Sequence, residues 1–283
     1  MHVSNSMKLS ALTSAALLLS LGVSCQQPRM YCTTAHGHFG AKYTLTSNNK
    51  GDPCAQQTGD VLGMQTYFAP GGVNGTPKFH EPSVAIRAQY GGLVFQTAFD
   101  YPGELAGFDY DDLGPPNAVS DFKSGDPDGE DICFADDFKG GVIDVPAFPE
   151  IPPVEDDPAT PDVDESDPGY PAEPAKLVKY EWSNAKWLVN PDAQGTQFEA
   201  DLKFTEDGCV AEYKVSAVYP AIDCQSDEDC TADDSGINPG FAVECDLSIN
   251  ANGLDVEDDP MTPENEAENW GICVLKEKIP SYE

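Results

Sequence analysis

Acidic side chains come closest, in type and spacing, to a chemical site in this chain. Asp126, Asp128 and Asp131 surround Gly129 in the segment Asp-Pro-Asp-Gly-Glu-Asp. Calcium binds oxygen ligands, and alternate carboxylates around a glycine turn can wrap one ion. The segment departs from the EF-hand loop in the spacing of its ligands. We therefore favour a solvated loop here and name Asp126, Asp128 and Asp131 as candidate calcium ligands.

Residues suited to catalysis are few. The sequence contains no G-x-S-x-G nucleophile elbow, no H-E-x-x-H helix and no glycine-rich phosphate loop. Downstream of residue 24, His36, His38 and His80 are the histidines available as general bases. His36 and His38 could also share a transition metal, because side chains two positions apart on a strand point the same way. We expect a protein that is not an enzyme, and no cofactor other than the possible calcium.

Charge excludes one class of partner. The 283 residues include 15 basic and 49 acidic side chains, which gives a formal net charge of −34. Such a field repels nucleic acid and anionic lipid headgroups. We expect no nucleic-acid partner and a solvated acidic exterior.

The N-terminus predicts export. Met7-Lys8 opens a short positive region, and Ala11–Leu21 is an apolar run too short to span a bilayer stably. The residues that follow, Leu21-Gly22-Val23-Ser24-Cys25, resemble the lipobox of bacterial lipoproteins, although the leucine stands one position early. The resemblance implies cleavage before Cys25 and acylation of its thiol and amine, with Gln26 typical of the outer-membrane-directed class. Ordinary secretory cleavage is the alternative.

The cysteine count agrees with export. If Cys25 carries lipid, an even number of cysteines remains, which suits a disulfide framework in an oxidising compartment. The predicted disulfide cysteines are Cys32, Cys54, Cys133, Cys209, Cys224, Cys230, Cys245 and Cys273.

The elements that would position these groups are β-strands. The segment Thr196–Tyr219 alternates apolar and polar residues on both sides of Asp207-Gly208, which predicts a hairpin with a two-residue turn. Its register would place Phe204 opposite Ala211 on an apolar face and Asp201 opposite Lys214 on a wet face, which Gln197 would share. Further strands are expected at 40–46, 61–68, 177–182 and 270–275, with a second hairpin over 83–101 that turns at Gly91-Gly92.

Two segments differ in amino-acid composition from the predicted strands. Pro146–Pro174 combines nine prolines with nine acidic residues and no basic one, which predicts a disordered acidic insertion. After Tyr219 the chain becomes rich in cysteine. Its C-x-S-D-x-D-C…C…G-x-C arrangement resembles the cysteine-rich segments of uncharacterised lipoproteins of myxobacteria, and the resemblance implies a disulfide-linked surface protein without a known activity.

Nearness along the expected topology favours Cys32–Cys54 and Cys133–Cys209. The tail would then close on itself as Cys224–Cys245 with Cys230–Cys273, or in the nested alternative. Eight cysteines allow many pairings in principle, so the connectivity stays open at this point.

These observations lead to one hypothesis. The chain is expected to be mostly β, with an antiparallel β-sandwich-like domain, long acidic proline-rich loops and a disulfide-rich C-terminal tail. Its expected function is that of a lipid-anchored, non-catalytic binding or structural protein at the outer membrane, held there by Cys25 and contacting an outer-membrane or cell-surface protein. The alternative is a calcium-dependent adhesion or carbohydrate-binding module, and a secreted hydrolase comes third. The expected division is signal peptide 1–24, tether 25–39, β-domain 40–220 with insertion 146–174, and tail 221–283.

Overall fold

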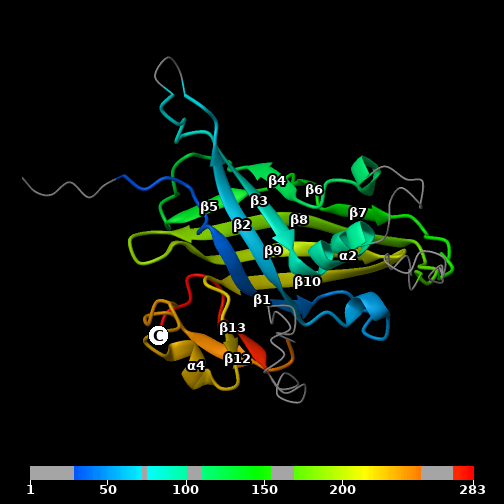
Figure 1. Cartoon of the computed structure of the whole chain (residues 1–283). Helices are drawn as coiled ribbons and strands as arrows, with labels where there is room; N and C mark the ends of the chain where they lie inside the picture. Colours follow the sequence, from blue (N-terminus) through cyan, green and yellow to red (C-terminus); the bar gives the residue numbers. More distant parts are fainter. Residues whose placement is uncertain (1–28, 72–74, 101–109, 154–168, 250–269) are drawn as a thin grey trace, which may run out of the picture. The chain divides into compact units, whose positions relative to one another are not determined.

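A computed structural model describes residues 29–71, 75–100, 110–153, 169–249 and 270–283, and it divides the chain into two units, Met1–Met30 and Tyr31–Glu283. The second unit contains one large and one small antiparallel sheet (Figure 1), which confirms the mostly-β class. The predicted signal peptide and Cys25 lie outside the described residues. None of the helices in the described ranges is long and apolar enough to span a bilayer.

The large sheet has ten strands in the order β5-β8-β9-β10-β1-β2-β3-β4-β6, with β7 also paired to β8. Strands β8 and β9 are the longest, and they are neighbours in the sheet. The bounds are β1 Gly37–Leu45, β2 Gly59–Phe68, β3 Pro82–Ala88, β4 Ala118–Asp121, β5 Ile132–Ala135, β6 Lys139–Gly140, β7 Val142–Val145, β8 Lys176–Val189, β9 Gln194–Glu206 and β10 Cys209–Val218.

The β9–β10 hairpin forms in the predicted register. Phe204 pairs with Ala211 and Asp201 with Lys214. The turn residue Asp207 has a φ of 48°, a left-handed conformation that Asp and Gly adopt more readily than other residues. Alternation of side chains therefore fixed both the turn and the register.

The large sheet curls until its two ends meet. Phe122, just after β4, bridges Ala135 at the end of β5, and the Lys123 amide donates to the Phe134 carbonyl at 2.8 Å. The curled sheet encloses an aromatic core in which the Trp187 ring lies 4.8 Å from Phe198 and 5.1 Å from Phe122, centroid to centroid. Burial of these rings removes a large apolar area from water.

Helix α2, Gln89–Asp100, replaces the second hairpin expected over 83–101, and that prediction was wrong beyond β3. The Asp60 carboxylate on β2 accepts hydrogen bonds from the amides of Val61 and Tyr90, so it satisfies donors at the start of the helix. A Cβ at Gly91 would lie 3.0 Å from the Tyr180 ring. Gly91 therefore serves close helix–sheet packing and not the expected turn.

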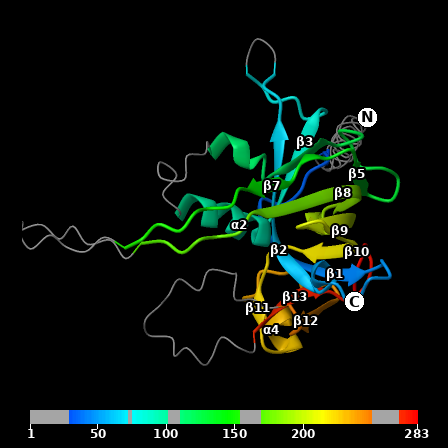
Figure 2. The ribbon, with the colours of Figure 1, turned by 90° about the vertical axis from the view of Figure 1, so that its right-hand side faces the viewer.

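The C-terminal module, residues 221–283, contains the small sheet in the order β11-β13-β12. Its elements are β11 Asp223–Cys224, α4 Asp227–Thr231, β12 Val243–Asp246 and β13 Gly271–Leu275. The module packs on the outer face of the large sheet, because a Cβ at Gly40 of β1 would lie 2.5 Å from the Cys273 carbonyl oxygen. Figures 1 and 2 place β13 beside β1 from two directions.

All eight cysteines between Cys32 and Cys273 form disulfides. The tail pairs as Cys224–Cys245 and Cys230–Cys273, the first of the two arrangements expected. The predicted Cys32–Cys54 and Cys133–Cys209 bridges were wrong, because the structure joins other partners. The observed bridges are Cys32–Cys133 and Cys54–Cys209.

The structure gives a spatial reason for the first two bridges. The Cys32 amide donates to the Gly125 carbonyl at 2.9 Å, which places Cys32 beside the segment that leads into β5 and Cys133. Cys54 lies in the 3-10 helix η1, Pro53–Ala55, which contacts β9 and β10, and its carbonyl accepts from the Tyr213 hydroxyl at 2.6 Å. These two disulfide pairings therefore follow from the order of the strands in space and not from nearness in sequence.

The acidic insertion is ordered at both of its described ends. Phe148 bridges Glu173 and Ile151 bridges Tyr170, so the chain leaves and returns as two paired segments (Figure 2). Phe148 is 3% exposed. The prediction of disorder was wrong for these ends, because paired backbone amides and one buried ring hold them, and its middle part, 154–168, lies outside the described residues.

Candidate functional site: a lysine-lined groove

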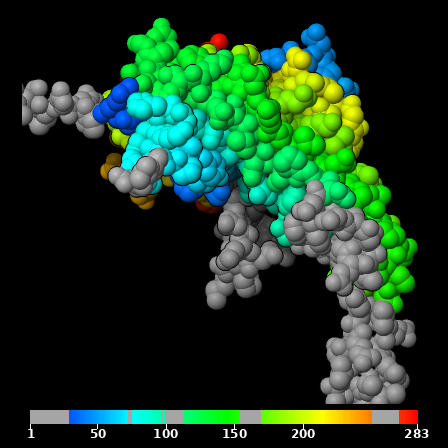
Figure 3. Space-filling view, turned by 90° about the horizontal axis from the view of Figure 1, so that it is seen from above, coloured from blue at the N-terminus to red at the C-terminus, as the bar shows by residue number. Residues whose placement is uncertain are grey.

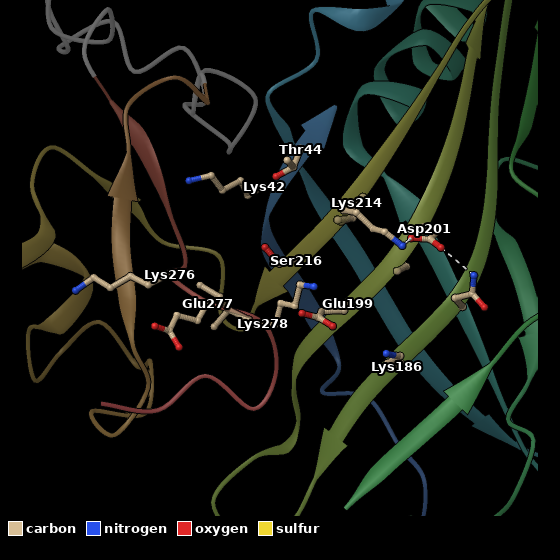
Figure 4. Close-up of a pocket in the computed structure, with 14 residues that line it drawn as sticks. Lys42, Thr44, Lys186, Glu199, Asp201, Lys214, Ser216, Lys276, Glu277 and Lys278 are labelled. Atoms are coloured by element: carbon tan, nitrogen blue, oxygen red, sulfur yellow. Dashed lines mark hydrogen bonds and ion pairs between the residues drawn. The ribbon is translucent and has the colours of Figure 1, made fainter. Parts of the chain in front are cut away.

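A groove of about 450 Å³ lies on the outer face of the large sheet, beside the C-terminal module (Figure 4). Five of the 13 lysines of the chain line it, although the protein carries a net charge of −34. We call it the lysine groove. Its lining residues are Lys42, Thr44, Asn184, Lys186, Glu199, Ala200, Asp201, Lys214, Val215, Ser216, Leu275, Lys276, Glu277 and Lys278.

The floor of the lysine groove is a row of outward-facing side chains across neighbouring strands. Lys42 of β1 pairs with Ser216 of β10, Ser216 with Glu199 of β9, and Glu199 with Lys186 of β8. Side chains directly opposite each other on one face of a sheet lie close together. The sheet register therefore aligns ammonium, hydroxyl and carboxylate groups along one line.

The chain after β13 forms the wall of the lysine groove. Gln197 anchors this segment through its side chain: its Nε2 atom donates to the Ser281 carbonyl at 2.9 Å, and its Oε1 atom accepts from the Ser281 backbone amide at 2.8 Å. The Glu199 carboxylate accepts from the Ile279 amide at 3.0 Å. Gln197 was predicted on the wet face, and that was wrong: it is fully buried, because the C-terminal segment covers it.

Two of the five lysines are held by carboxylates. The Lys42 ammonium lies 2.9 Å from Glu244 and 3.0 Å from Asp246, both on β12, and so joins the sheet to the C-terminal module. Lys214 forms an ion pair with Asp201, which also accepts from the Asn184 side-chain Nδ2 atom at 2.8 Å. These pairs fix the side chains at two edges of the groove.

The pKa values follow from these contacts. Partial burial opposes the charge on the Lys42 ammonium, but the hydrogen bonds to Glu244 and Asp246 outweigh it and raise the pKa of Lys42. Partial burial likewise opposes ionisation of Asp201, and the hydrogen bonds from Lys214 and Asn184 outweigh it and lower the pKa of Asp201. The Lys42 ammonium and the Asp201 carboxylate are therefore charged at neutral pH.

The other three lysines have no such partner. Among the described residues, the ammonium groups of Lys186, Lys276 and Lys278 have no carboxylate within 4.0 Å. In Figure 4, Lys186 and Lys278 lie on either side of Glu199, and Lys276 extends away from the large sheet. An ammonium group is a compact charge that binds phosphate and carboxylate groups. The arrangement can therefore hold an anion next to hydroxyl groups of Thr44 and Ser216.

The three candidate calcium ligands do not converge. Within the described ranges, no three carboxylates have ligand atoms within 4.8 Å of one another. The Asp128 Oδ1 atom accepts from the amides of Glu130 and Ile132, both at 2.9 Å, and Asp126 lies 3.9 Å from the His80 Nδ1 atom. Asp131 closes the turn with a φ of 62°. These contacts shape a loop.

The histidine pair lies on another part of the same outer face. His36 and His38 are exposed beside Arg87 in a hollow of about 200 Å³ over β1, β2 and β3. The Arg87 guanidinium lies 5.9 Å from the centre of the Phe95 ring. No described group of ligand atoms gathers around the two histidines.

One metal-like cluster consists of disulfide sulfurs. Cys224, Cys230 and Cys273 bring their sulfur atoms within 4.8 Å of one another. Each sulfur is bonded in the Cys224–Cys245 or Cys230–Cys273 bridge, so none is a thiolate available to a metal.

Sequence reasoning found part of the lysine groove. The hairpin register predicted the contact of Asp201 with Lys214, and the structure contains it. Lys276 and Lys278 were not expected there, because no pattern in residues 276–283 shows that this segment crosses β9. The signal that could have indicated this crossing is Gln197, because a buried glutamine side chain needs hydrogen-bond partners from a neighbouring segment.

The fold and the groove define a class: a mostly-β protein, cross-linked by four disulfides, with a lysine-lined surface on an acidic molecule. Comparison with known sequences adds the family. The sequence model of the MlpA family matches residues 37–220, and the chain belongs to this family. The match runs from β1 through β10, so the family relationship rests on the large sheet and not on the cysteine-rich tail that carried the resemblance.

A curated relative agrees with this assignment. The chain is 31% identical over 112 residues to a Myxococcus xanthus protein named “Putative lipoprotein MlpA”. The alignment covers 38% of this chain and 41% of that protein, so it spans less than half the length of either. No solved structure matches this chain.

Proposed function

We propose that this protein is an exported lipoprotein of the outer membrane that binds an anionic cell-surface glycan without catalysis. The anchor is a lipid on Cys25. It is supported by the apolar run Ala11–Leu21, the small residues before Cys25 and the name of the Myxococcus xanthus relative. Cysteine pairing adds to this, because the eight cysteines from Cys32 onward are used in disulfides and Cys25 is the ninth.

The observation that carries the binding function is the lysine groove. Its volume of about 450 Å³ falls in the usual range for ligand sites. Lys186 and Lys278 offer charge to a carboxylate or phosphate group, and Asn184, Thr44 and Ser216 offer hydrogen-bonding groups to sugar hydroxyls. An acidic sugar of a polysaccharide or glycolipid matches both kinds of group.

The chemistry of the groove supports binding in preference to catalysis. Two of its three carboxyl groups are occupied: Asp201 accepts from Lys214 and Asn184, and Glu199 accepts from the Ile279 amide. A general acid needs a raised pKa, and the pKa of Asp201 is lowered. Among the residues that line the described groove there is no histidine.

Charge reversal in the groove tests the binding function. The Lys186→Glu/Lys278→Glu variant should bind acidic cell-surface polysaccharide about tenfold more weakly than wild type, a change of about 1.4 kcal/mol. The matched control, Lys50→Glu/Lys179→Glu, makes the same change in net charge outside the groove. Titration calorimetry at low and high salt, with a neutral polysaccharide as reference, measures the effect. Equal losses in the two variants would show that only net charge matters.

The anchor has a separate test. Metabolic labelling with an alkyne fatty acid should mark the wild type and leave Cys25→Ala unmarked, because the acylated atom is gone. Equal labelling of the two proteins would sink the proposed anchor, whatever the groove binds.

A further inference from the structure

An aromatic cluster, which we call the aromatic tip, lies where the described part of the second unit begins. The Tyr31 ring stacks on Phe79 with 5.3 Å between centroids, and Phe79 meets Phe68 at 5.2 Å. Phe79 remains 38% exposed, although each of these contacts would favour its burial. The aromatic tip consists of Tyr31, Phe68 and Phe79.

The aromatic tip belongs to the connection between β2 and β3, which projects beyond the sheet (Figure 1). Phe68 ends β2, and the Lys78 amide donates to the Ala69 carbonyl at 3.0 Å, so the two arms stay paired past the sheet. Figure 3 shows the start of the second unit, in blue, beside the cyan surface of this connection. The contact between Tyr31 and Phe79, which are far apart in sequence, holds the start of the unit against this protruding loop.

The charge around the aromatic tip differs from that of the whole chain. Residues 61–80 contain no acidic side chain, and neither do residues 25–51, although 49 of the 283 residues are acidic. Two acidic side chains lie near the tip: Glu81, which pairs with Lys78 at 2.8 Å, and Asp126, whose carboxylate is 3.9 Å from the His80 Nδ1 atom. The repulsion from anionic headgroups that the net charge predicts is therefore reduced here.

Chain length connects this cluster with the membrane. Six residues lead from Cys25 to Tyr31. A fully extended chain of that length spans at most about 20 Å. If the proposed lipid on Cys25 lies in the bilayer, Tyr31 and the rings it contacts stay within that reach of the surface. Aromatic side chains with one apolar and one polar side are enriched at the membrane–water interface.

We propose that the aromatic tip inserts into the interface of the membrane that carries the anchor. This inference rests on the proposed acylation of Cys25, and it adds an oriented second contact. Phe79 supplies exposed apolar area, and Tyr31 and Phe68 hold its ring from two sides. The tip would then limit how the protein can turn about its anchor at Cys25.

Fluorescence quenching in vesicles tests the tip independently of acylation. The mature chain from Gln26, with an N-terminal hexahistidine tag, is tethered to phosphatidylcholine vesicles that contain a nickel-chelating lipid and brominated acyl chains. The Phe79→Trp variant should show about twofold more quenching, after subtraction of the wild-type signal, than Leu247→Trp. Leu247 is the matched control because it is 59% exposed on the C-terminal module.

Equal quenching at the two positions would overturn the proposed membrane contact. Hydrogen exchange on the unsubstituted tethered protein provides a second readout: amides in residues 66–71 and 75–81 should exchange more slowly on vesicles than in solution, and unchanged exchange would also overturn it. The nickel tether replaces the lipid, so either negative result concerns the tip alone. Failure of the anchor is detected only by the labelling of Cys25.

Discussion

The large sheet and the C-terminal module are stabilised in different ways. The large sheet buries big aromatic side chains, with Trp187, Phe198 and Phe204 almost without exposure. Its two disulfides join residues 101 and 155 positions apart. The module has three short strands and the five-residue helix α4, and its disulfides close loops of only 21 and 43 residues.

This difference indicates which force dominates in each region. A buried aromatic ring removes a large apolar area from water, so the sheet has a core of its own. The apolar residues of the module, such as Phe241 and Val243, form one cluster with Leu188, Ala193 and Val218 of the sheet. The module therefore relies on cross-links and on the sheet beneath it, as small regions with little core commonly do.

Truncation of the sheet core should have the largest effect. Phe198→Ala removes a ring that contacts Trp187 at 4.8 Å and Trp182 at 6.2 Å, and should lower the free energy of unfolding by about 3–5 kcal/mol. Val210→Ala on β10, 42% exposed, is the control and should change it by less than about 1 kcal/mol. Denaturant unfolding measures both. Similar small effects would mean that the aromatic core does not dominate.

Removal of a module disulfide should have the next largest effect, and it should be local. Cys230→Ala/Cys273→Ala should cost about 2–4 kcal/mol, because the unfolded module gains conformational freedom. Hydrogen exchange should show faster opening in β12 and β13, with β9 and β10 unchanged. Loss of protection in β9 and β10 to the same degree would show that the two regions unfold as one unit.

The same contrast explains what the sequence predicted well. The β9–β10 hairpin was predictable to the residue, because alternation over Thr196–Tyr219 and the Asp207-Gly208 turn are local signals. Helix α2 was not, because its start depends on Asp60, which lies 30 positions before Tyr90. In the sequence, Gly91-Gly92 indicates a turn. Only the position of the Tyr180 ring shows that Gly91 allows the helix to pack closely on the sheet.

The candidate site was predictable only in part, for a related reason. Asp201 and Lys214 meet through the hairpin register, which the sequence encodes. The wall of the lysine groove depends on where residues 276–283 run, and the contacts of Gln197 with Ser281 join positions 84 apart. The disulfides between Cys32 and Cys133 and between Cys54 and Cys209 likewise follow from the order of strands in space.

A smaller effect, dependent on pH, should arise in the sheet. Burial raises the pKa of the Asp60 carboxyl to about 7 from its usual 3.8, although the amides of Val61 and Tyr90 favour its charged form. The folded state thus keeps a proton that the unfolded state releases. Stability from Asp60 is complete below pH 3.8 and is lost as the pH rises to about 7. Asp60→Asn should flatten this part of the stability curve.

Asp207 is the matched control for Asp60. The hydrogen bond from the Leu177 amide, together with Lys176, lowers the pKa of Asp207, so its stabilisation is present above pH 3.8 and lost as the pH falls. Asp207→Asn should therefore leave the slope between pH 4 and 7 unchanged, while Asp60→Asn reduces it. Thermal melts across this range measure both variants. Identical slopes in wild type and Asp60→Asn would contradict the role assigned to Asp60.

Calcium should have the smallest effect, and the reason is common to both regions. In the sheet region, Asp128 accepts from the amides of Glu130 and Ile132. In the module, Asp229 accepts from the amides of Gln225 and Ser226 at 2.8 and 2.9 Å. Each carboxylate already accepts hydrogen bonds from two backbone amides at a turn. In both regions these acidic side chains therefore stabilise a turn.

Millimolar calcium should therefore leave the melting temperature of the wild type within the error of measurement. Asp128→Ala should lower stability by about 1 kcal/mol with or without calcium, because two amides lose their acceptor. Asp126→Ala is the control, since its carboxylate does not bond those amides. A rise of several degrees on adding calcium, abolished by either substitution, would instead establish a cation site in this loop. Bound calcium would then compete with the two amides for the Asp128 carboxylate, and residues 126–131 would have to rearrange around the ion.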